Sequence, residues 1–364
     1  MTRIATALVL LGLAGACRVP QGVKHDRFDV TLGDVQVRAE LSFKSPPRNQ
    51  RLPGVLLVHG GGPADLDHSI RDAAGTLVSA NFKTLAEHLA EAGFAVLRHD
   101  KRHAQPGGDA AALQELEQSE RLADAEAMLE FLRRDMIVDP KRLFVIGQGD
   151  GASVAAHLAR RHPEVSGLVL ISPVVSSRAR NLRDQVHRLV LPYLREHSER
   201  EDAIGAVGLA RALAAPRGEP LTSWLRELTE ANDQGARIPH SALDLDHDGY
   251  LHFEDELGTW ADEVLREQAP GLGRDDLAPV QALAEEWSVP LLILIGESDP
   301  VTYSTDVRRF HEALTTAGHV DHSFHRYERL GHTLGEAPSR FLDPLGPIQS
   351  APLADLASWL EERS

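Results

Sequence analysis

The sequence predicts an α/β protein with a mostly parallel sheet, and three patterns lead to this prediction. Short, continuously apolar runs alternate along the chain with segments in which apolar residues recur at helical spacing. Runs that are apolar throughout indicate strands buried on both faces, as in parallel sheets covered by helices. A long polar stretch interrupts the alternation once, which indicates a core carrying a single insertion.

The first expected element is a β-hairpin at the edge of the sheet. Apolar and polar residues alternate on both sides of Gly33-Asp34, a pair that suits a tight turn. The buried strands are expected at residues 54–58, 95–97, 143–146, 168–171 and 291–295. The helices that cover them are expected at residues 84–92, 122–132 and 152–161, where charged residues lie opposite the apolar ones.

The polar interruption defines the expected domain organisation. From about residue 176 to 288 the buried-strand pattern stops and Arg- and Glu-rich helical segments replace it, until Val289-Pro290 restarts the strand pattern. We therefore predict a core formed by residues 25–175 and 289–364 and a helical cap insertion over residues 176–288.

Composition limits the classes of partner. At 364 residues and 42% hydrophobic, the chain can bury a sizeable core. Its formal net charge of -16 argues against nucleic-acid binding, because that affinity comes largely from clustered Lys and Arg that neutralise phosphates. We expect no nucleic-acid partner.

The N-terminus has the pattern of an export signal. Arg3 precedes an apolar run over residues 4–16 that is too short to span a bilayer comfortably. The sequence Leu13-Ala14-Gly15-Ala16-Cys17 resembles the lipobox of bacterial lipoproteins, whose cysteine is acylated after cleavage. We expect residues 1–17 to form a signal segment and the protein to be exported, either lipid-anchored to a bacterial cell membrane through Cys17 or periplasmic or extracellular. A plain secretory signal is the alternative.

Four motifs follow one another in an order shared by one superfamily. They are Val58-His59-Gly60-Gly61-Gly62, Gly147-Gln148-Gly149-Asp150-Gly151, Gly296-Glu297-Ser298-Asp299-Pro300 and Leu330-Gly331-His332-Thr333. Over residues 53–173 and 289–334 the chain resembles bacterial serine aminopeptidase-like and esterase members of the α/β-hydrolase superfamily. The resemblance implies an α/β-hydrolase fold and an origin among ester or peptide hydrolases.

The resemblance also implies a role for each motif. Gly61 and Asp150 would supply the backbone N–H groups of an oxyanion hole, Asp299 would be the triad acid, and His332 would be the triad base. We expect the side chains of Asp299 and His332 to be neighbours at the C-terminal edge of the sheet. The segment 98–102, which contains Asp-Lys-Arg, is expected to have a structural role.

The nucleophile position departs from the family pattern. The motif G-x-S-x-G reads G-x-G-x-G here, so Gly149 replaces the serine while the glycines that permit the sharp turn remain. Glycine adopts a strained elbow conformation easily, so folding need not suffer. Without its serine, a triad enzyme keeps only about 10³- to 10⁴-fold acceleration over water. We therefore predict an impaired hydrolase that binds a small ester- or peptide-like ligand or an unknown protein.

Two active alternatives remain open. Asp150 becomes the nucleophile if the elbow shifts by one residue, although Gln148 and Ala152 would then replace the flanking glycines. A water molecule activated by His332 is the other alternative.

The insertion contains an acidic loop at residues 244–255 that resembles an EF-hand calcium loop. Acids stand at positions one, three and five, and glycine stands at position six, where the loop must bend. The expected Ca²⁺ ligands are Asp244, Asp246, Asp248, Tyr250 through its carbonyl, His252 and Asp255. Asp255 is shorter than the usual glutamate, which predicts weaker affinity. A solvated acidic turn and a non-enzymatic, calcium-dependent binding protein are the alternatives.

Overall fold

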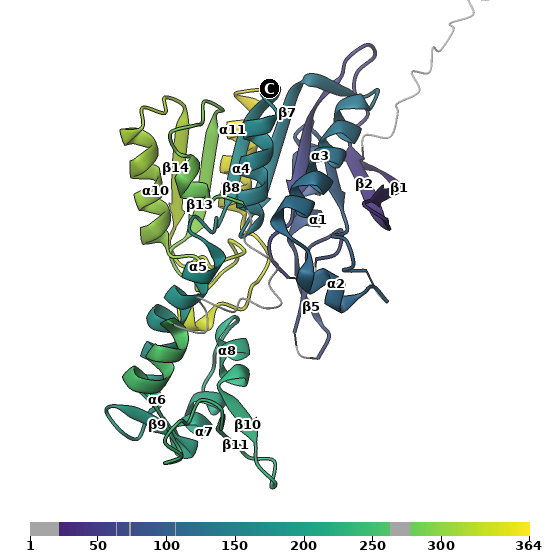
Figure 1. Ribbon diagram of the computed structural model, residues 1–364. Coiled ribbons are helices and arrows are strands. Elements are labelled where there is room, and N and C mark those ends of the chain that lie inside the picture. Colours follow the sequence, from purple (N-terminus) through teal and green to yellow (C-terminus); the bar gives the residue numbers. More distant parts are fainter. Residues whose placement is uncertain (1–21, 63, 73, 106, 263–276) are drawn as a thin grey trace, which may run out of the picture.

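A computed structural model describes residues 22–62, 64–72, 74–105, 107–262 and 277–364. Its core is an eight-stranded sheet with the strand order β1-β2-β6-β3-β7-β8-β13-β14 (Figure 1). The strands are β1 (Lys24–Leu32), β2 (Val35–Phe43), β3 (Leu52–Val58), β6 (Ala95–His99), β7 (Val138–Gln148), β8 (Val165–Ile171), β13 (Leu291–Gly296) and β14 (His322–Tyr327). Strand β2 pairs antiparallel with β1 and β6, and the other neighbours pair parallel. The predicted mostly parallel α/β fold is confirmed.

Helices cover both faces of this sheet, which explains why its central strands are apolar throughout. All residues of β3, β6 and β13 are buried. On one face Val55 and Leu57 of β3 belong to a cluster with α1 (Asn81–Glu91) and α11 (Ser350–Glu361). On the other face Leu56 belongs to a cluster that includes residues of α3 (Gln118–Arg134), α4 (Gly151–Arg161) and α10 (Ser304–Thr316).

Helix α3 begins four residues before the predicted residue 122, and its first turn explains the difference. Glu117 and Glu120 form a capping box, in which each side chain accepts a hydrogen bond from the other residue's backbone N–H. Polar first turns of this kind extend a helix beyond its apolar pattern. Shorter elements of the core are α2 (Ala110–Glu115), which Asp109 caps, the hairpin β4 (Ser69–Arg71) and β5 (Leu77–Ala80), and the 3₁₀ turns Val280–Leu283 and Arg340–Leu342.

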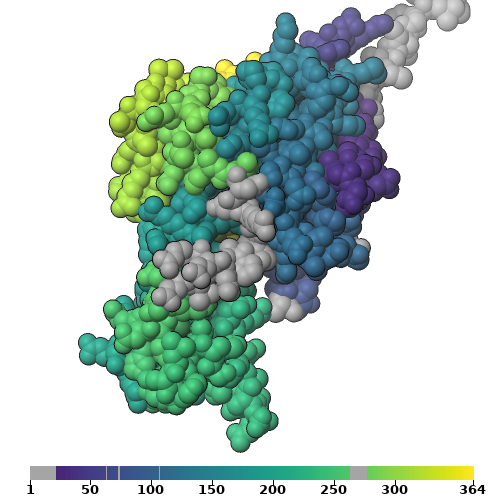
Figure 2. All heavy atoms as spheres, in the orientation of Figure 1, coloured from purple at the N-terminus to yellow at the C-terminus, as the bar shows by residue number. Residues whose placement is uncertain are grey.

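Residues 178–262, which lie between β8 and β13, form a lobe that projects from one end of the core (Figures 1 and 2). The 3₁₀ turn Val280–Leu283, which follows later in the chain, packs in the core. Its helices are α5 (Arg178–Gln185), α6 (Leu191–His197), α7 (Ala206–Ala214) and α8 (Leu221–Glu227), with π-helical turns at Val186–Val190 and Phe253–Gly258. The lobe has its own apolar cluster, which includes Leu194, Leu209 and Leu251.

The lobe differs from the predicted helical cap because it also contains two small antiparallel sheets. Strand β9 (Ala203–Gly205) pairs with β12 (Tyr250–His252), and β10 (Thr229–Ala231) pairs with β11 (Arg237–Pro239). Strands of three residues are too short to show a period-two pattern in the sequence, so the pattern analysis missed them.

No helix in the described part of the chain is long and apolar enough to cross a membrane. The predicted signal segment, residues 1–17 with Cys17, lies outside the described residues.

Candidate active site

The turn between β7 and α4 has the geometry of a nucleophile elbow, although its central residue has no side chain. Gly149 has φ +57°, in the left-handed region that favours glycine. A Cβ on Gly147 would lie 2.6 Å from the Cβ of Ala155, and a Cβ on Gly151 would lie 2.3 Å from the carbonyl oxygen of His59. Close packing therefore requires both flanking glycines, which fits the unshifted register of the motif.

Asp299 and His332 meet beside this turn. Asp299 follows β13, and its Oδ2 lies 3.0 Å from Nδ1 of His332. The backbone N–H groups of Val301 and Thr302 donate to Oδ1 of Asp299 at 2.7 and 2.9 Å, which orients the carboxylate. A Cβ on Gly149 would lie 3.2 Å from Nε2 of His332. The three positions of a triad are thus adjacent, with the serine side chain missing.

The Asp299 carboxylate also determines the proton affinity of His332. Burial by itself lowers the pKa of His332, but the charge of Asp299 and its hydrogen bond outweigh burial and raise that pKa above its usual value. His332 is therefore more readily protonated than an exposed histidine, with its Nδ1–H directed at Asp299.

Asp343 is a functional candidate that the sequence reasoning missed. It is fully buried, and its carboxylate accepts the backbone N–H of His332 at 2.7 Å and that of Leu345 at 2.8 Å. Burial raises the pKa of Asp343. This residue holds the loop that carries His332. The Asp343-Pro344 pair, which like Asp299-Pro300 suits a turn, was the available signal.

The segment after β6 holds the glycine-rich loop, which is the structural role predicted for residues 98–102. The ammonium group of Lys101 donates to the carbonyl oxygens of Gly60 at 2.5 Å and Gly62 at 2.6 Å. Asp100 accepts the backbone N–H of Leu66 at 2.7 Å. Burial, together with the charge of Arg121, lowers the pKa of Lys101 well below its usual value.

The loop lies next to the elbow, where an oxyanion hole would form. A Cβ on Gly60 would lie 3.8 Å from the backbone nitrogen of Asp150, and one on Gly61 would lie 3.8 Å from the Asp150 Cβ. Within the described residues, the backbone N–H groups of Gly61 and Asp150 donate no hydrogen bond. Both predicted oxyanion donors are therefore available to a ligand.

The Asp150 side chain is engaged in ion pairs. Its Oδ2 accepts from the guanidinium of Arg121 at 2.6 Å, Oδ1 accepts from Gln118 at 3.3 Å, and the Nε of Arg178 lies 3.8 Å from Oδ1. Burial raises the pKa of Asp150, but the charges of Arg121 and Arg178 outweigh it and lower that pKa. Among the described contacts Asp150 makes none with His332, so the geometry does not favour Asp150 as a nucleophile.

His68 is a second residue near the site that the sequence reasoning did not single out. Its Nδ1 lies 3.2 Å from Oε1 of Gln148, the residue before Gly149. Burial, with the charge of Lys101, lowers the pKa of His68 to about 4, so this imidazole is neutral at neutral pH.

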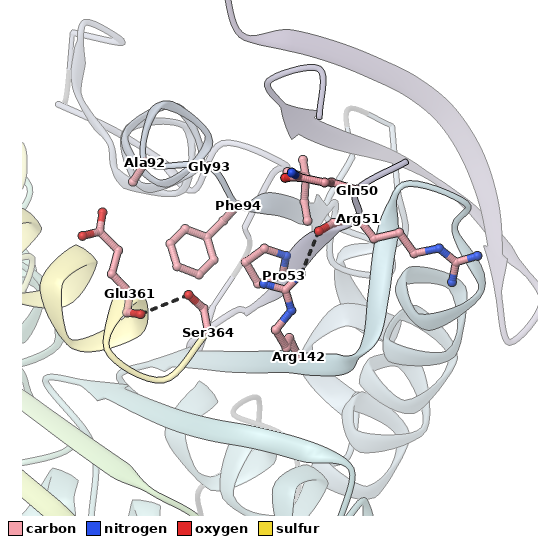
Figure 3. A pocket seen from close by; sticks show the side chains of 10 residues that line it. Gln50, Arg51, Pro53, Ala92, Gly93, Phe94, Arg142, Glu361 and Ser364 are labelled. Atoms are coloured by element: carbon pink, nitrogen blue, oxygen red, sulfur yellow. Dashed lines mark hydrogen bonds between the residues drawn. The ribbon is translucent and has the colours of Figure 1, made fainter. Parts of the chain in front are cut away.

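A pocket of about 440 Å³ lies elsewhere on the core (Figure 3). Leu52 and Pro53 at the start of β3 line it together with Phe94, which precedes β6, and Arg142 donates to the carbonyl oxygen of Arg51 at 2.7 Å. These residues mark the N-terminal ends of the parallel strands, whereas ligands of open α/β sheets bind at the C-terminal ends. We do not assign this pocket to the candidate site.

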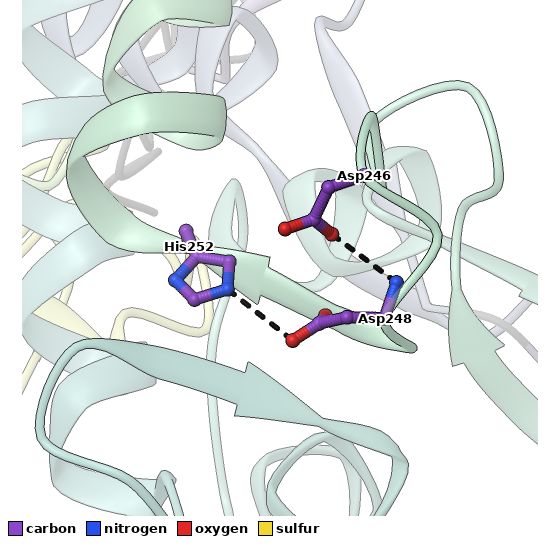
Figure 4. Close-up of side chains that lie close together, drawn as sticks. All are labelled: Asp246, Asp248 and His252. Carbon is purple, nitrogen blue, oxygen red and sulfur yellow. Dashed lines mark hydrogen bonds and ion pairs between the residues drawn. The ribbon is translucent and has the colours of Figure 1, made fainter.

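The acidic loop in the lobe turns as its sequence predicts. Gly249 has φ +82°, and its N–H donates to Asp244 at 3.0 Å. Asp246 accepts the N–H of Asp248 at 3.1 Å, and Asp248 lies 3.5 Å from Nε2 of His252 (Figure 4). Ligand atoms of Asp246, Asp248 and His252 lie within 4.8 Å of one another.

The structure places a different carboxylate, Glu256, beside the acids of this loop where the sequence predicted Asp255. Asp255 is exposed and belongs to neither cluster of possible metal ligands in the described part of the loop, whereas the next residue, Glu256, is buried. Glu256 accepts the N–H of Leu245 at 2.5 Å and that of His252 at 2.8 Å, and its carboxylate lies within 4.8 Å of ligand atoms of Asp244 and Asp246. Glu256 lies within the π-helical turn Phe253–Gly258. Tyr250 lies in β12, and the guanidinium of Arg200 lies 3.4 Å from its ring centroid.

Comparison with known proteins agrees with this fold. Residues 77–206 match a family model described as serine aminopeptidase, S33, a segment that contains the elbow but neither Asp299 nor His332. Esterase EstD of Thermotoga maritima is 29% identical over 161 residues, which cover 44% of this chain but only 35% of the esterase. The match therefore spans about a third of that relative's length.

Solved structures show the same architecture. The α/β hydrolase GrgF from Penicillium sp. sh18 gives a TM-score of 0.52 at 14% identity, covering 93% of this chain and 99% of that one. A hypothetical protein from Pseudomonas aeruginosa gives a TM-score of 0.53 at 14% identity, covering 99% and 100%. At these identities the likeness shows the fold alone. The chain is an α/β-hydrolase-fold protein with esterase- and peptidase-like relatives.

Proposed function

We propose that this protein is an impaired hydrolase that binds a small ester- or peptide-like ligand, or a protein segment, without cleaving it efficiently. One observation carries the proposal: Gly149 stands at the tip of an otherwise complete elbow. A Cβ atom at this position would lie 3.2 Å from Nε2 of His332. The oxyanion donors and the Asp299–His332 pair support binding and polarisation of a carbonyl group. Covalent catalysis would need a nucleophilic hydroxyl at position 149, and glycine has none.

Neighbouring hydroxyls do not replace the missing one. Ser153 and Ser172 are buried near the elbow, and the Oγ atom of each has no hydrogen-bond partner among the described residues. Neither hydroxyl forms a hydrogen bond with His332 in the described structure, so neither is activated by that base in this arrangement. A water molecule activated by His332 remains the alternative route to slow turnover.

Hydrolysis assays test the proposal directly. We expect the purified protein to hydrolyse short acyl nitrophenyl esters and aminoacyl nitroanilides at rates close to the uncatalysed background. The His332→Ala variant should give the same rates. Turnover by the wild type that His332→Ala abolishes would contradict the proposal and would point to a His332-activated water.

We further propose that the acidic loop binds one Ca²⁺ ion, which stabilises the lobe. Its donor set is composed mainly of carboxylate oxygens, the ligands that Ca²⁺ prefers, and includes the carboxylate of Glu256. The backbone N–H contacts of Asp244 and Glu256 hold these carboxylates together in one turn. The ion would fix the shape of the lobe, with no step in catalysis.

Two neighbouring carboxylates provide a matched test of the calcium proposal. Calcium at about 100 times its Kd should stabilise the lobe by roughly 2.7 kcal/mol, measured as calcium-dependent protection from proteolysis. Glu256→Gln should abolish this protection, and Asp255→Asn should retain it, because Asp255 is exposed. Equal losses in both variants, or no effect of calcium in the wild type, would refute the site.

The N-terminal sequence supports export and lipid anchoring through Cys17. Expressed in a bacterial host and supplied with a labelled fatty acid, the full chain should incorporate the label, and Cys17→Ala should not. Label retained in Cys17→Ala would refute acylation at this residue.

A further inference from the structure

The lobe contacts the core through Gly218 and Glu219, which come shortly before α8. The backbone N–H of Gly218 donates to the carbonyl oxygen of Phe341 at 2.8 Å. That of Glu219 donates to the carbonyl oxygen of Asp343 at 3.1 Å. Thr222, in the first turn of α8, donates to the carbonyl oxygen of Gly218 at 3.1 Å through its backbone N–H and through its hydroxyl. Gly218 is therefore tied to α8 on one side and to the segment of Asp343 on the other.

Asp343 is packed between Gly218 and the loop that carries His332. Its carboxylate accepts the backbone N–H of His332 at 2.7 Å. A Cβ on Gly218 would overlap the carbonyl oxygen of Asp343 and lie 2.5 Å from its backbone nitrogen. A Cβ on Gly331, the residue before His332, would lie 2.6 Å from Oδ1 of Asp343. Packing this close leaves Asp343 little room, so a displacement at Gly218 is transmitted to the backbone of His332.

Helix α8 also reaches the residue next to the Asp299 carboxylate. Trp224, in α8, donates its indole N–H to Oε1 of Gln185 at 3.1 Å. Gln185 is buried, and its Nε2 donates to the carbonyl oxygen of Val301 at 3.4 Å. The backbone N–H of Val301 in turn donates to Oδ1 of Asp299 at 2.7 Å. A glutamine suits this place because its amide accepts from one neighbour and donates to another.

We propose that Gly218 and Gln185 are positioning residues, through which helix α8 holds the Asp299 carboxylate and the His332 imidazole at hydrogen-bonding distance. Each acts through one intermediate residue, and in the described structure neither hydrogen-bonds to the pair itself. The role rests on the proposed function of the pair, which is to bind and polarise a carbonyl group. The lobe then sets the geometry of the site from outside it.

NMR titration of the His332 imidazole in the full-length protein tests the proposal, with His332→Gln used to assign its signal. Gly218→Ala displaces Asp343 and should separate the pair, so the pKa of His332 should fall by about half a unit or more as the imidazolium loses part of its partner. Gln185→Leu should lower the same pKa by less, because its 3.4 Å contact is long for a hydrogen bond. Gln234→Leu, the same substitution at an exposed position of the lobe, should leave the pKa unchanged.

A double-variant comparison separates loss of positioning from other causes. The charges of Asp299 and Asp343 both raise the pKa of His332, and His68, with its pKa lowered to about 4, is neutral over the titration. Once Asp299→Asn has removed the carboxylate, each substitution should shift the His332 pKa by less than about half as much as before. A shift of the same size in the Asp299→Asn background would overturn the proposal, because that shift would arise without the pair.

The single variants also decide the proposal residue by residue. An unchanged His332 pKa in either folded single variant would overturn the role of that residue. If Gly218→Ala fails to fold, which circular dichroism would show, Gln185→Leu decides alone. Hydrolysis of nitrophenyl esters by the wild type would contradict the proposed function separately, since the titration does not depend on turnover.

Discussion

Gly149→Ser is expected to gain esterase turnover that depends on His332, on the order of 10²-fold above the wild type. The variant restores a hydroxyl beside a histidine whose Nδ1 is already held by Asp299 at 3.0 Å. The available N–H groups of Gly61 and Asp150 would stabilise the developing oxyanion. In an intact triad enzyme the three residues together contribute about 10⁶ in kcat, so the expected gain is partial.

Two features of the elbow limit the gain. A non-glycine residue at φ +57° costs on the order of 1–2 kcal/mol in backbone strain. The new Cβ would lie 3.2 Å from His332 Nε2, which is a tight contact, so the imidazole has to move by a few tenths of an ångström. The Asp343 contact to the backbone of His332 opposes a larger shift of that loop.

The assay uses nitrophenyl butyrate, with Gly149→Ala and the double variant Gly149→Ser/His332→Ala as controls. Gly149→Ala carries the same Cβ without the hydroxyl and should stay inert, as should the double variant. Turnover in Gly149→Ser that survives loss of His332 would show that the restored serine does not use this histidine.

Arg121→Met is expected to destabilise the protein by about 3–5 kcal/mol, the cost of leaving a buried charge without its partner. Arg121 donates to Asp150 at 2.6 Å and to the carbonyl oxygen of His59 at 2.7 Å, and all three groups are buried. Arg178, at 3.8 Å, is a weaker partner for the Asp150 carboxylate. Because this partner remains in the variant, the expected loss of stability lies towards the lower end of that range.

Urea unfolding measures this change, with Arg133→Met as the matched control. Arg133 belongs to the same helix, but its pair with Glu130 is exposed, so its replacement should change the free energy of unfolding little. The double variant Arg121→Met/Asp150→Asn should recover part of the loss, because it removes the uncompensated carboxylate. An Arg121→Met effect no larger than that of Arg133→Met would mean that Arg121 does not hold the elbow to the loop.

The sequence by itself determined the class of fold and the order of the site motifs. Strands covered on both faces must be apolar throughout, so the runs that become β3, β7 and β13 were visible without any contact information. The elbow glycines were visible for a similar reason, since a backbone turn this close to its neighbours tolerates no side chain at Gly147 or Gly151. That glycine, Gly149, stands where the motif has serine is likewise a fact of sequence.

Tertiary structure alone decided which other residues serve these motifs. Lys101 reaches the carbonyl oxygen of Gly60 and Asp343 reaches the backbone of His332, contacts between residues 41 and 11 positions apart. Tertiary structure also decided which carboxylate meets the other acids of the acidic loop: Glu256, in the π-helical turn Phe253–Gly258, lies near Asp244 and Asp246, and Asp255 is exposed. Periodicity and motif spacing indicate which face each segment buries. The hydrogen-bond partner of a buried polar group depends on which other segments pass close to it, and only the tertiary packing determines their positions.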